Sequence, residues 1–91
     1  MIVIQMPALK RQVKRLHPQQ KVDFETALRA VMADPLAGDL KTGDLERVRV
    51  YKFRMIGQLT LLAYSVAPDA SSITLYAVGP HENFYRDLKR S

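Results

Sequence analysis

The C-terminal stretch of the chain, residues 78–90, holds the side chains best suited to chemistry. It reads Val-Gly-Pro-His-Glu-Asn-Phe-Tyr-Arg-Asp-Leu-Lys-Arg, with His81 and Tyr85 followed by the cations Arg86, Lys89 and Arg90. Histidine titrates near neutral pH, so it can donate or accept a proton there. A tyrosine adds a ring for stacking and a hydroxyl, and the cations attract phosphate. These side chains together have the chemistry needed to handle RNA.

Each of these side chains also has a structural interpretation. His81 follows a proline and could cap a terminal helix, and Tyr85 could pack on a sheet beside Phe84 and Leu88, which we assign to the core. His17 precedes a proline and most simply ends a helix. The two histidines lie far apart and show no ligand spacing, so the sequence predicts no metal site.

The composition bounds the class of protein. A chain of 91 residues is expected to form one domain, residues 1–91. It carries 14 Lys+Arg against 9 Asp+Glu, a formal net charge of +5. That balance suits a nucleic acid or an acidic protein partner, and also an ordinary solvated surface. Cysteine is absent, which excludes disulfides and cysteine nucleophiles. The apolar residues 1–6 are too short for a signal or a membrane span, so we expect a soluble intracellular protein.

The N-terminal part of the chain predicts a strand and two helices. Ile2–Met6 reads as a short strand, and Pro7 can occupy the first position of a helix. A second helix is expected over residues 18–33, since Pro18 interrupts the first and Asp34-Pro35 ends the second. Helical spacing joins the apolar side chains Leu9, Val13 and Leu16 in the first helix, and Phe24, Ala27, Leu28 and Val31 in the second. Together they predict an antiparallel helical hairpin.

The C-terminal part predicts mainly strands. We expect a polar loop over 36–46, strands over 47–56, 58–66 and 72–78, a turn over 68–71 and a terminal helix over 82–90. The apolar phase of the first strand shifts between Val50 and Tyr51, where we expect a β-bulge. The order β-α-α-β-β-β-α predicts an α+β fold: a small antiparallel sheet with the helical hairpin on one face and a short C-terminal helix.

Two segments resemble the RelE/ParE superfamily, the toxins of bacterial type II toxin–antitoxin systems. Tyr51-Lys52-Phe53-Arg54 through Leu62-Ala63-Tyr64 resembles the second and third strands of RelE, which begin Tyr-Lys-apolar-basic and end apolar-apolar-Tyr. Val78-Gly79-Pro80-His81 through Tyr85 resembles the Val-Gly-x-basic…Tyr end of RelE, and more closely the Gly-x-His…aromatic end of the YafQ branch. The resemblance covers essentially the whole chain, and its specific part is residues 47–90.

The resemblance implies an endoribonuclease that cleaves mRNA in the ribosomal A site without a metal or any other cofactor. In that reaction the 2′-hydroxyl attacks the neighbouring phosphate, fixed cations stabilise the developing charge, and a group titrating near neutrality moves the proton. Carried over position by position, the catalytic set is His81, Tyr85, Lys52 and Arg54. The further cations expected to bind RNA are Arg47, Arg49, Arg86, Lys89 and Arg90.

One position departs from the RelE pattern and leaves other functions open. Leu61 stands where RelE has an arginine before the apolar-apolar-Tyr triplet. The chain is therefore also read as a ParE-like, non-enzymatic inhibitor of DNA gyrase, or as an inactive module that binds an antitoxin. In each case the resemblance implies a small acidic antitoxin from the same operon, a toxin–antitoxin hetero-oligomer and a place in the bacterial cytoplasm. For the nuclease it also implies mRNA and ribosome as partners, and no membrane.

Overall fold

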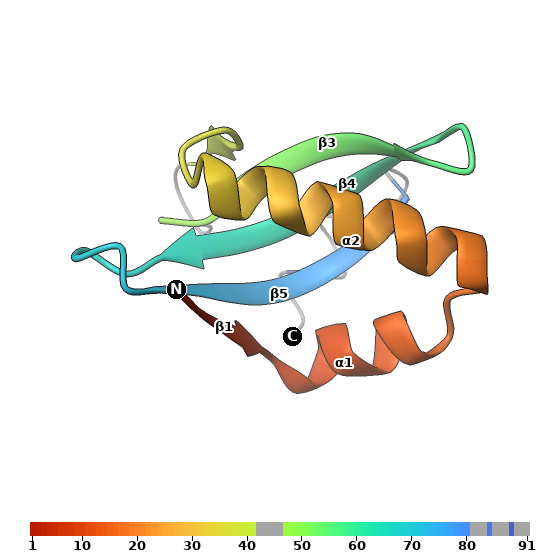
Figure 1. Cartoon of the computed structure of the whole chain (residues 1–91), viewed down its shortest axis with the longest axis horizontal. Coiled ribbons are helices and arrows are strands. Elements are labelled where there is room, and N and C mark those ends of the chain that lie inside the picture. Colours follow the sequence, from red (N-terminus) through yellow and green to blue (C-terminus); the bar gives the residue numbers. More distant parts are fainter. Residues whose placement is uncertain (42–46, 81–83, 85–87, 89–91) are drawn as a thin grey trace.

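The computed structural model describes residues 1–41 and 47–80, together with Phe84 and Leu88. Its elements follow in the order β1 (Ile2–Gln5), α1 (Pro7–Lys14), α2 (Pro18–Ala33), β2 (Asp39–Leu40), β3 (Arg49–Met55), β4 (Gln58–Val66) and β5 (Ser72–Pro80) (Figure 1). Phe84 and Leu88 are helical, and the remainder of the predicted terminal helix lies outside the described residues.

The strands form one five-stranded sheet in the order β1-β5-β4-β3-β2. The α+β expectation is therefore confirmed. The sheet is mixed, however, because β1 runs parallel to β5 while the other three pairings are antiparallel. The short strand β2 lies inside the segment expected to be a loop, where Asp39 pairs with Val50 and Leu40 with Arg49.

The second helix matches its expected bounds, whereas the first ends earlier than expected, at Lys14. Leu16 therefore lies after α1, and His17 is the N-cap of α2 instead of the end of α1. Each helix begins at a proline, Pro7 or Pro18, a position where the missing backbone donor costs no helical hydrogen bond. In Figure 1 they cross the same face of the sheet in opposite directions, which confirms the helical hairpin. Among the described residues, no helix is long and apolar enough to cross a membrane.

The main core lies between the helices and the sheet. The predicted helical stripes face it, and Leu9 and Val31 are fully buried there. From the sheet, Leu62, Tyr64, Ile73 and Leu75 pack against them. Because both helices bury their apolar stripes on one face of the sheet, the opposite face is left for other contacts.

A second, smaller core occupies the opposite face of the sheet. Val50, Leu61, Ala63 and Ala77 pack there with Phe84 and Leu88, as expected for the last two. This packing explains the shift of apolar phase in β3: Val50 faces the second core and the next residue faces the first. The predicted bulge at that point is wrong, since β3 and β4 pair without interruption. The irregularity falls instead in the β4–β5 pairing, at Ala63/Tyr64.

A buried tyrosine ties the loop after α2 to the sheet. The Tyr64 hydroxyl donates to the carbonyl of Pro35 at 2.7 Å and accepts the N–H of Gly38 at 2.9 Å. A Cβ on Gly38 would lie 2.8 Å from the ring, so the close approach requires glycine. The final residue of the apolar-apolar-Tyr triplet is therefore a structural anchor.

Candidate functional site

Lys52 and Arg54 are exposed on the face of β3 turned away from the helices. They alternate with Tyr51, Phe53 and Met55, which pack toward the main core, so the two cations share the other face of the strand. The Arg54 guanidinium donates to the carbonyl of Gly57 at 3.2 Å, at the tip of the β3–β4 hairpin. Two cations of one strand therefore stand near the hairpin, on the face that also carries the second core. We call the exposed part of that face around Lys52 and Arg54 the open face.

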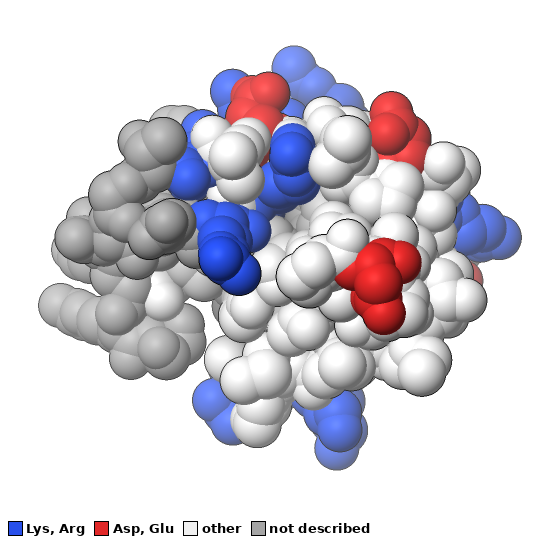
Figure 2. Space-filling model, turned by 90° about the vertical axis from the view of Figure 1, so that its left-hand side faces the viewer, with Lys and Arg blue, Asp and Glu red and all other residues white. Residues whose placement is uncertain are grey.

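These cations are free of carboxylate partners within the described part of the chain. The one ion pair found there joins Arg29 and Glu25 at 3.9 Å along exposed α2. Cations without a carboxylate partner stay available for phosphate oxygens, with which they form strong charge-assisted hydrogen bonds. Figure 2, which views the opposite end of the molecule from the hairpin, shows Lys and Arg interrupted by Asp and Glu. On this face, the cations therefore form no continuous patch.

Leu61 lies across from Lys52 in the β3–β4 register and is fully buried. It packs in the second core with Phe84 and Leu88. The position that carries an arginine in RelE therefore holds a packing residue here. Its side chain supplies volume to the core and no charge to the open face.

Arg49 and Arg47, the other two described cations of the predicted set, do not share the position of Lys52 and Arg54. Arg49 is half-buried, and its guanidinium donates to the carbonyls of Gly38 at 2.8 Å and Leu36 at 3.4 Å. It shares the phase of Tyr51 rather than that of Lys52, so it lies on the helix-side face and holds the loop after α2. Arg47 is exposed in a turn with a φ of 70°.

The C-terminal members of the predicted site, His81, Tyr85, Arg86, Lys89 and Arg90, lie outside the described residues. The structure does carry β5 two residues further than expected, to Pro80. Pro80 pairs with Thr60, which pairs with Phe53 on its other side. Two strand spacings amount to about 10 Å, so the end of β5 lies about that far from the segment between Lys52 and Arg54.

The sequence indicates none of the hollows found among the described residues, two of which are lined in part by α1. The larger one, of about 420 Å³, is lined by Met6, Pro7, Ala8, Arg11, Val48, Tyr76 and Leu88. The smaller one, of about 220 Å³, lies at one end of the layer between helices and sheet, and we call it the end pocket; it is lined by Gln12, Arg15, Leu16, Gln20, Met55, Gln58, Thr60, Val78, Gly79 and Pro80. Because the lining residues come from distant segments, no local motif marks either hollow.

No cluster of three or more His, Cys, Asp or Glu side chains that could hold a metal ion occurs among the described residues. Those residues thus supply cations and hydrogen-bond donors to the open face and its rim. Such a surface can bind phosphate and stabilise negative charge.

Comparison with known families identifies the class of protein to which this sheet with two helices on one face belongs. The chain matches the family described as "ParE-like toxin of type II bacterial toxin-antitoxin system" over residues 3–89. Because the match spans nearly the whole chain, the protein belongs to this family of type II toxins. A comparison with functionally curated proteins found no significant match.

Solved structures of RelE toxins share the fold. The toxin chain of the intact E. coli RelBE toxin–antitoxin complex superposes with a TM-score of 0.71 at 17% identity, over 89% of this chain and 96% of that chain. The RelBE2 toxin–antitoxin complex of Mycobacterium tuberculosis gives 0.72 at 17% identity, over 88% and 96%. Isolated E. coli RelE gives 0.65 at 18% identity, over 98% and 96%. These likenesses establish a RelE-like fold.

Proposed function

We propose that this single-domain toxin is a metal-independent mRNA endoribonuclease that acts at the ribosome in the bacterial cytoplasm and blocks translation. The observation that carries the proposal is the pair Lys52 and Arg54, exposed on the open face without a described carboxylate partner. Structural likeness to RelE toxins supports the same assignment. Cations fixed on a rigid strand are suited to a reaction whose charge develops on phosphate.

The proposed reaction needs no cofactor. The 2′-hydroxyl of the RNA attacks the adjacent phosphorus, a pentacoordinate phosphorane forms, and the 5′-oxygen leaves with a proton. Lys52 and Arg54 stabilise the negative charge on the phosphorane. His81 exchanges the proton, and the ring of Tyr85 holds an unstacked base. The cations Arg47, Arg86, Lys89 and Arg90 bind the RNA backbone. Arg49 also belongs to this set, through the guanidinium N–H groups that its hydrogen bonds to the loop after α2 do not use.

Inhibition of DNA gyrase by a non-enzymatic, ParE-like mechanism is the second candidate. The observation that favours it is Leu61, whose buried apolar side chain leaves the open face with fewer cations than the RelE pattern has. The family description names ParE as well. An inactive antitoxin-binding module is the third candidate, favoured by the same residue.

The proposed partner under each candidate is a small acidic antitoxin from the same operon, held in a hetero-oligomer. RelE toxins of E. coli and M. tuberculosis were solved in such complexes. A partly disordered acidic segment that folds on binding could wrap the helical hairpin and cover the cations of the sheet. Co-purification from the native operon tests this. High-yield expression of the chain alone, without growth arrest, would count against it.

An experiment in growing cells distinguishes the nuclease from the gyrase inhibitor. After induction of the chain without its antitoxin, a nuclease lowers protein synthesis first, whereas a gyrase inhibitor first induces the DNA-damage response. If His81 moves the proton, His81→Gln should slow RNA cleavage by about 10²–10⁴-fold. If Tyr85 stacks on a base, Tyr85→Phe should stay toxic and Tyr85→Ala should not. A folded His81→Gln protein that cleaves at the parental rate removes His81 from the mechanism.

A further inference from the structure

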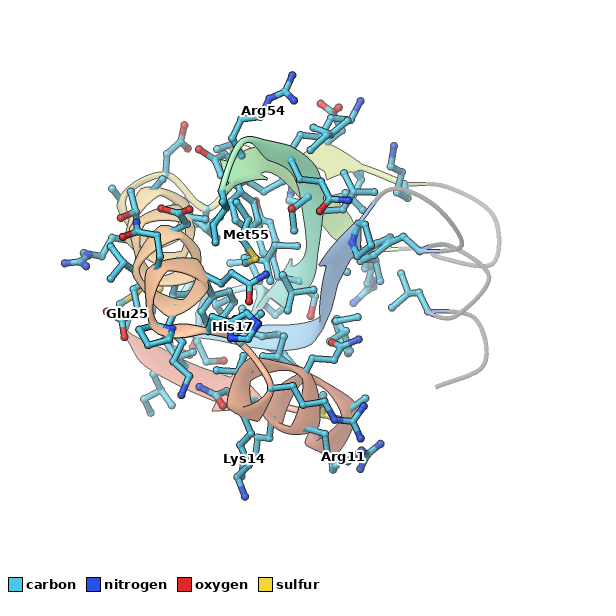
Figure 3. All side chains as sticks on the ribbon, turned by 90° about the vertical axis from the view of Figure 1, so that its right-hand side faces the viewer. Arg11, Lys14, His17, Glu25, Arg54 and Met55 are labelled. Atoms are coloured by element: carbon cyan, nitrogen blue, oxygen red, sulfur yellow. The ribbon has the colours of Figure 1, made fainter. Side chains whose placement is uncertain are left out.

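The end pocket lies where three parts of the fold meet. The connection between α1 and α2, the β3–β4 hairpin and the end of β5 surround it. Figure 3 looks onto this end of the molecule: Met55 lies at the centre, His17 lies beside it in the helix connection, and Arg54 points outward from the hairpin above. The pocket therefore opens close to the hairpin that carries the proposed phosphate-binding cations, on the other face of the sheet.

The wall of the end pocket toward the core is apolar. Met55 and Val78 are buried, and Leu16 packs against the main core at the same place. An apolar surface of this kind accepts the face of a flat ring, because burying it removes apolar area from water.

The rim of the end pocket carries side-chain amides whose orientation is fixed. Gln12 Oε1 accepts the N–H of Val78 at 2.9 Å, and Gln20 Oε1 accepts the N–H of His17 at 2.8 Å. Each amide oxygen is therefore occupied, while neither Nε2 group has a hydrogen-bond partner among the described residues. An amide NH₂ can donate two hydrogen bonds. The rim thus offers oriented donors from two helices.

The remaining polar groups complete the rim. Arg15, exposed at the end of α1, adds a guanidinium. The Thr60 hydroxyl donates to the carbonyl of Gln58 at 3.0 Å, so its oxygen is left to accept. The Gln58 amide is exposed on the same side of the pocket. Among the described residues of the rim, donors outnumber acceptors, which favours a ligand edge that presents carbonyl oxygens.

We propose that the end pocket binds one nucleobase of the RNA and selects bases that present a carbonyl oxygen. This inference deepens the proposed function, because it assigns a specificity subsite to the same substrate. The pocket volume of about 220 Å³ is below the roughly 300–1,000 Å³ of sites for drug-sized ligands, so a single base is the fitting size. Guanine, uracil and cytosine each present a carbonyl oxygen as an acceptor, whereas adenine has no carbonyl and presents only ring nitrogens and an amino group.

The strand register connects this subsite with the proposed cleavage face. Thr60 of the pocket pairs with Phe53, which lies between the two phosphate-binding cations on the other face of the hairpin. An RNA strand on Lys52 and Arg54 can therefore turn over the end of the sheet and place a neighbouring base in the pocket. An acidic side chain of the antitoxin is the competing occupant. It is less favoured because the described residues of the pocket include a single cation, Arg15, above an apolar wall.

Binding of nucleotides to the full-length chain tests the inference without requiring cleavage. The probes are GMP, UMP, CMP, AMP, inorganic phosphate and an acetylated glutamate peptide, each titrated against ¹⁵N-labelled protein. We expect saturable shifts at the amides of Gln58, Thr60 and Val78 with GMP or a pyrimidine nucleotide, and weaker binding of AMP. Arg15→Ala and Gln58→Ala should each weaken binding about 3- to 10-fold, the range of one lost hydrogen bond.

Matched controls keep the test specific. Lys14→Ala removes an exposed cation next to Arg15, and Gln19→Ala removes an exposed amide one residue from Gln20; neither residue lines the pocket. Both variants should bind as the parent does. Equal binding of inorganic phosphate, preference for the glutamate peptide, or no shift at the pocket amides would overturn the inference. Nucleotide binding in a chain that cuts no transcript would reject the proposed function and leave the subsite standing.

Discussion

Removing one hydroxyl, in Tyr64→Phe, is expected to destabilise the protein severely. The hydroxyl, on a fully buried side chain, holds two backbone groups: the buried N–H of Gly38 and the part-buried carbonyl of Pro35. Phenylalanine keeps the ring and leaves both groups without that partner. A buried polar group left unpaired costs about 1–3 kcal/mol, so the free energy of unfolding should fall by about 2–4 kcal/mol. For a domain of this size that corresponds to a loss of roughly 10–25 °C in Tm.

Urea unfolding with linear extrapolation measures this loss, and Tyr76→Phe is the matched control. The Tyr76 hydroxyl shares a hydrogen bond of 2.8 Å with Ser65 Oγ, and both residues are half-buried. Water can replace that partner, so we expect a loss of at most about 1 kcal/mol. If Tyr64→Phe loses no more stability than Tyr76→Phe, the loop after α2 does not depend on the Tyr64 hydroxyl and the reasoning is refuted.

The same residue predicts a pH dependence. Burial raises the pKa of Tyr64 above its ordinary value of 10.0, although the Gly38 hydrogen bond and the Arg49 charge act in the opposite direction. A folded-state pKa above the unfolded one gives stability that is complete below about pH 10 and is lost as the pH rises further. The phenylalanine variant has no ionisable hydroxyl at this position, so its stability lacks this pH-dependent contribution. The difference in stability between parent and variant should therefore narrow above pH 10, and a constant difference would contradict the assignment.

Three further predictions concern the hairpin and the open face. Ile56, with a φ of 48° in the hairpin turn, is a β-branched residue in a left-handed conformation, so Ile56→Asn should stabilise the fold by about 1 kcal/mol in thermal melts. An unchanged Tm would show that the turn is unstrained. Leu61→Ala should cost about 2–5 kcal/mol because the side chain is fully buried, and half-buried Leu59→Ala should cost less; equal losses in urea unfolding would contradict the core assignment. Lys52→Ala/Arg54→Ala should weaken ribosome association and flatten its salt dependence, while an unchanged salt slope would assign both residues to plain surface.

The helices could be predicted from local sequence because prolines and periodic apolar residues mark them clearly. Pro7 and Pro18 set both starts, and α2 begins and ends where its pattern does, at Pro18 and Ala33. The boundaries of β4, Gln58–Val66, also match, because a strand buried on both faces is apolar throughout.

Long-range pairings were beyond the reach of local patterns. The residues of Ile2–Gln5 do not indicate that β1 pairs with β5. The two-residue strand β2 forms only because Arg49 and Val50 lie beside it in the fold. The shift of apolar phase after Val50 predicts a bulge, but it has another cause. Two separate cores cover opposite faces of β3, so adjacent residues can both be apolar. One strand can be apolar on both faces without any break in its register.

In the candidate site too, local patterns predict some features, whereas others depend on long-range contacts. Strand alternation is enough to place Lys52 and Arg54 on one face of β3 and Arg49 on the other, as the structure has them. Its hydrogen bonds to Gly38 and Leu36 follow from tertiary contact with the loop after α2, which no motif encodes. No motif indicates the end pocket for the same reason, since its residues come from five elements and the α1–α2 connection and meet only in the fold.

The most direct test of the central claim maps transcript ends in cells that express the chain without its antitoxin. The nuclease account predicts new 5′ ends within translated reading frames soon after induction. These ends should disappear when translation is blocked beforehand, and a folded Lys52→Ala/Arg54→Ala variant should produce far fewer of them. Intact transcripts together with early induction of the DNA-damage response would contradict the account and assign the toxin to gyrase.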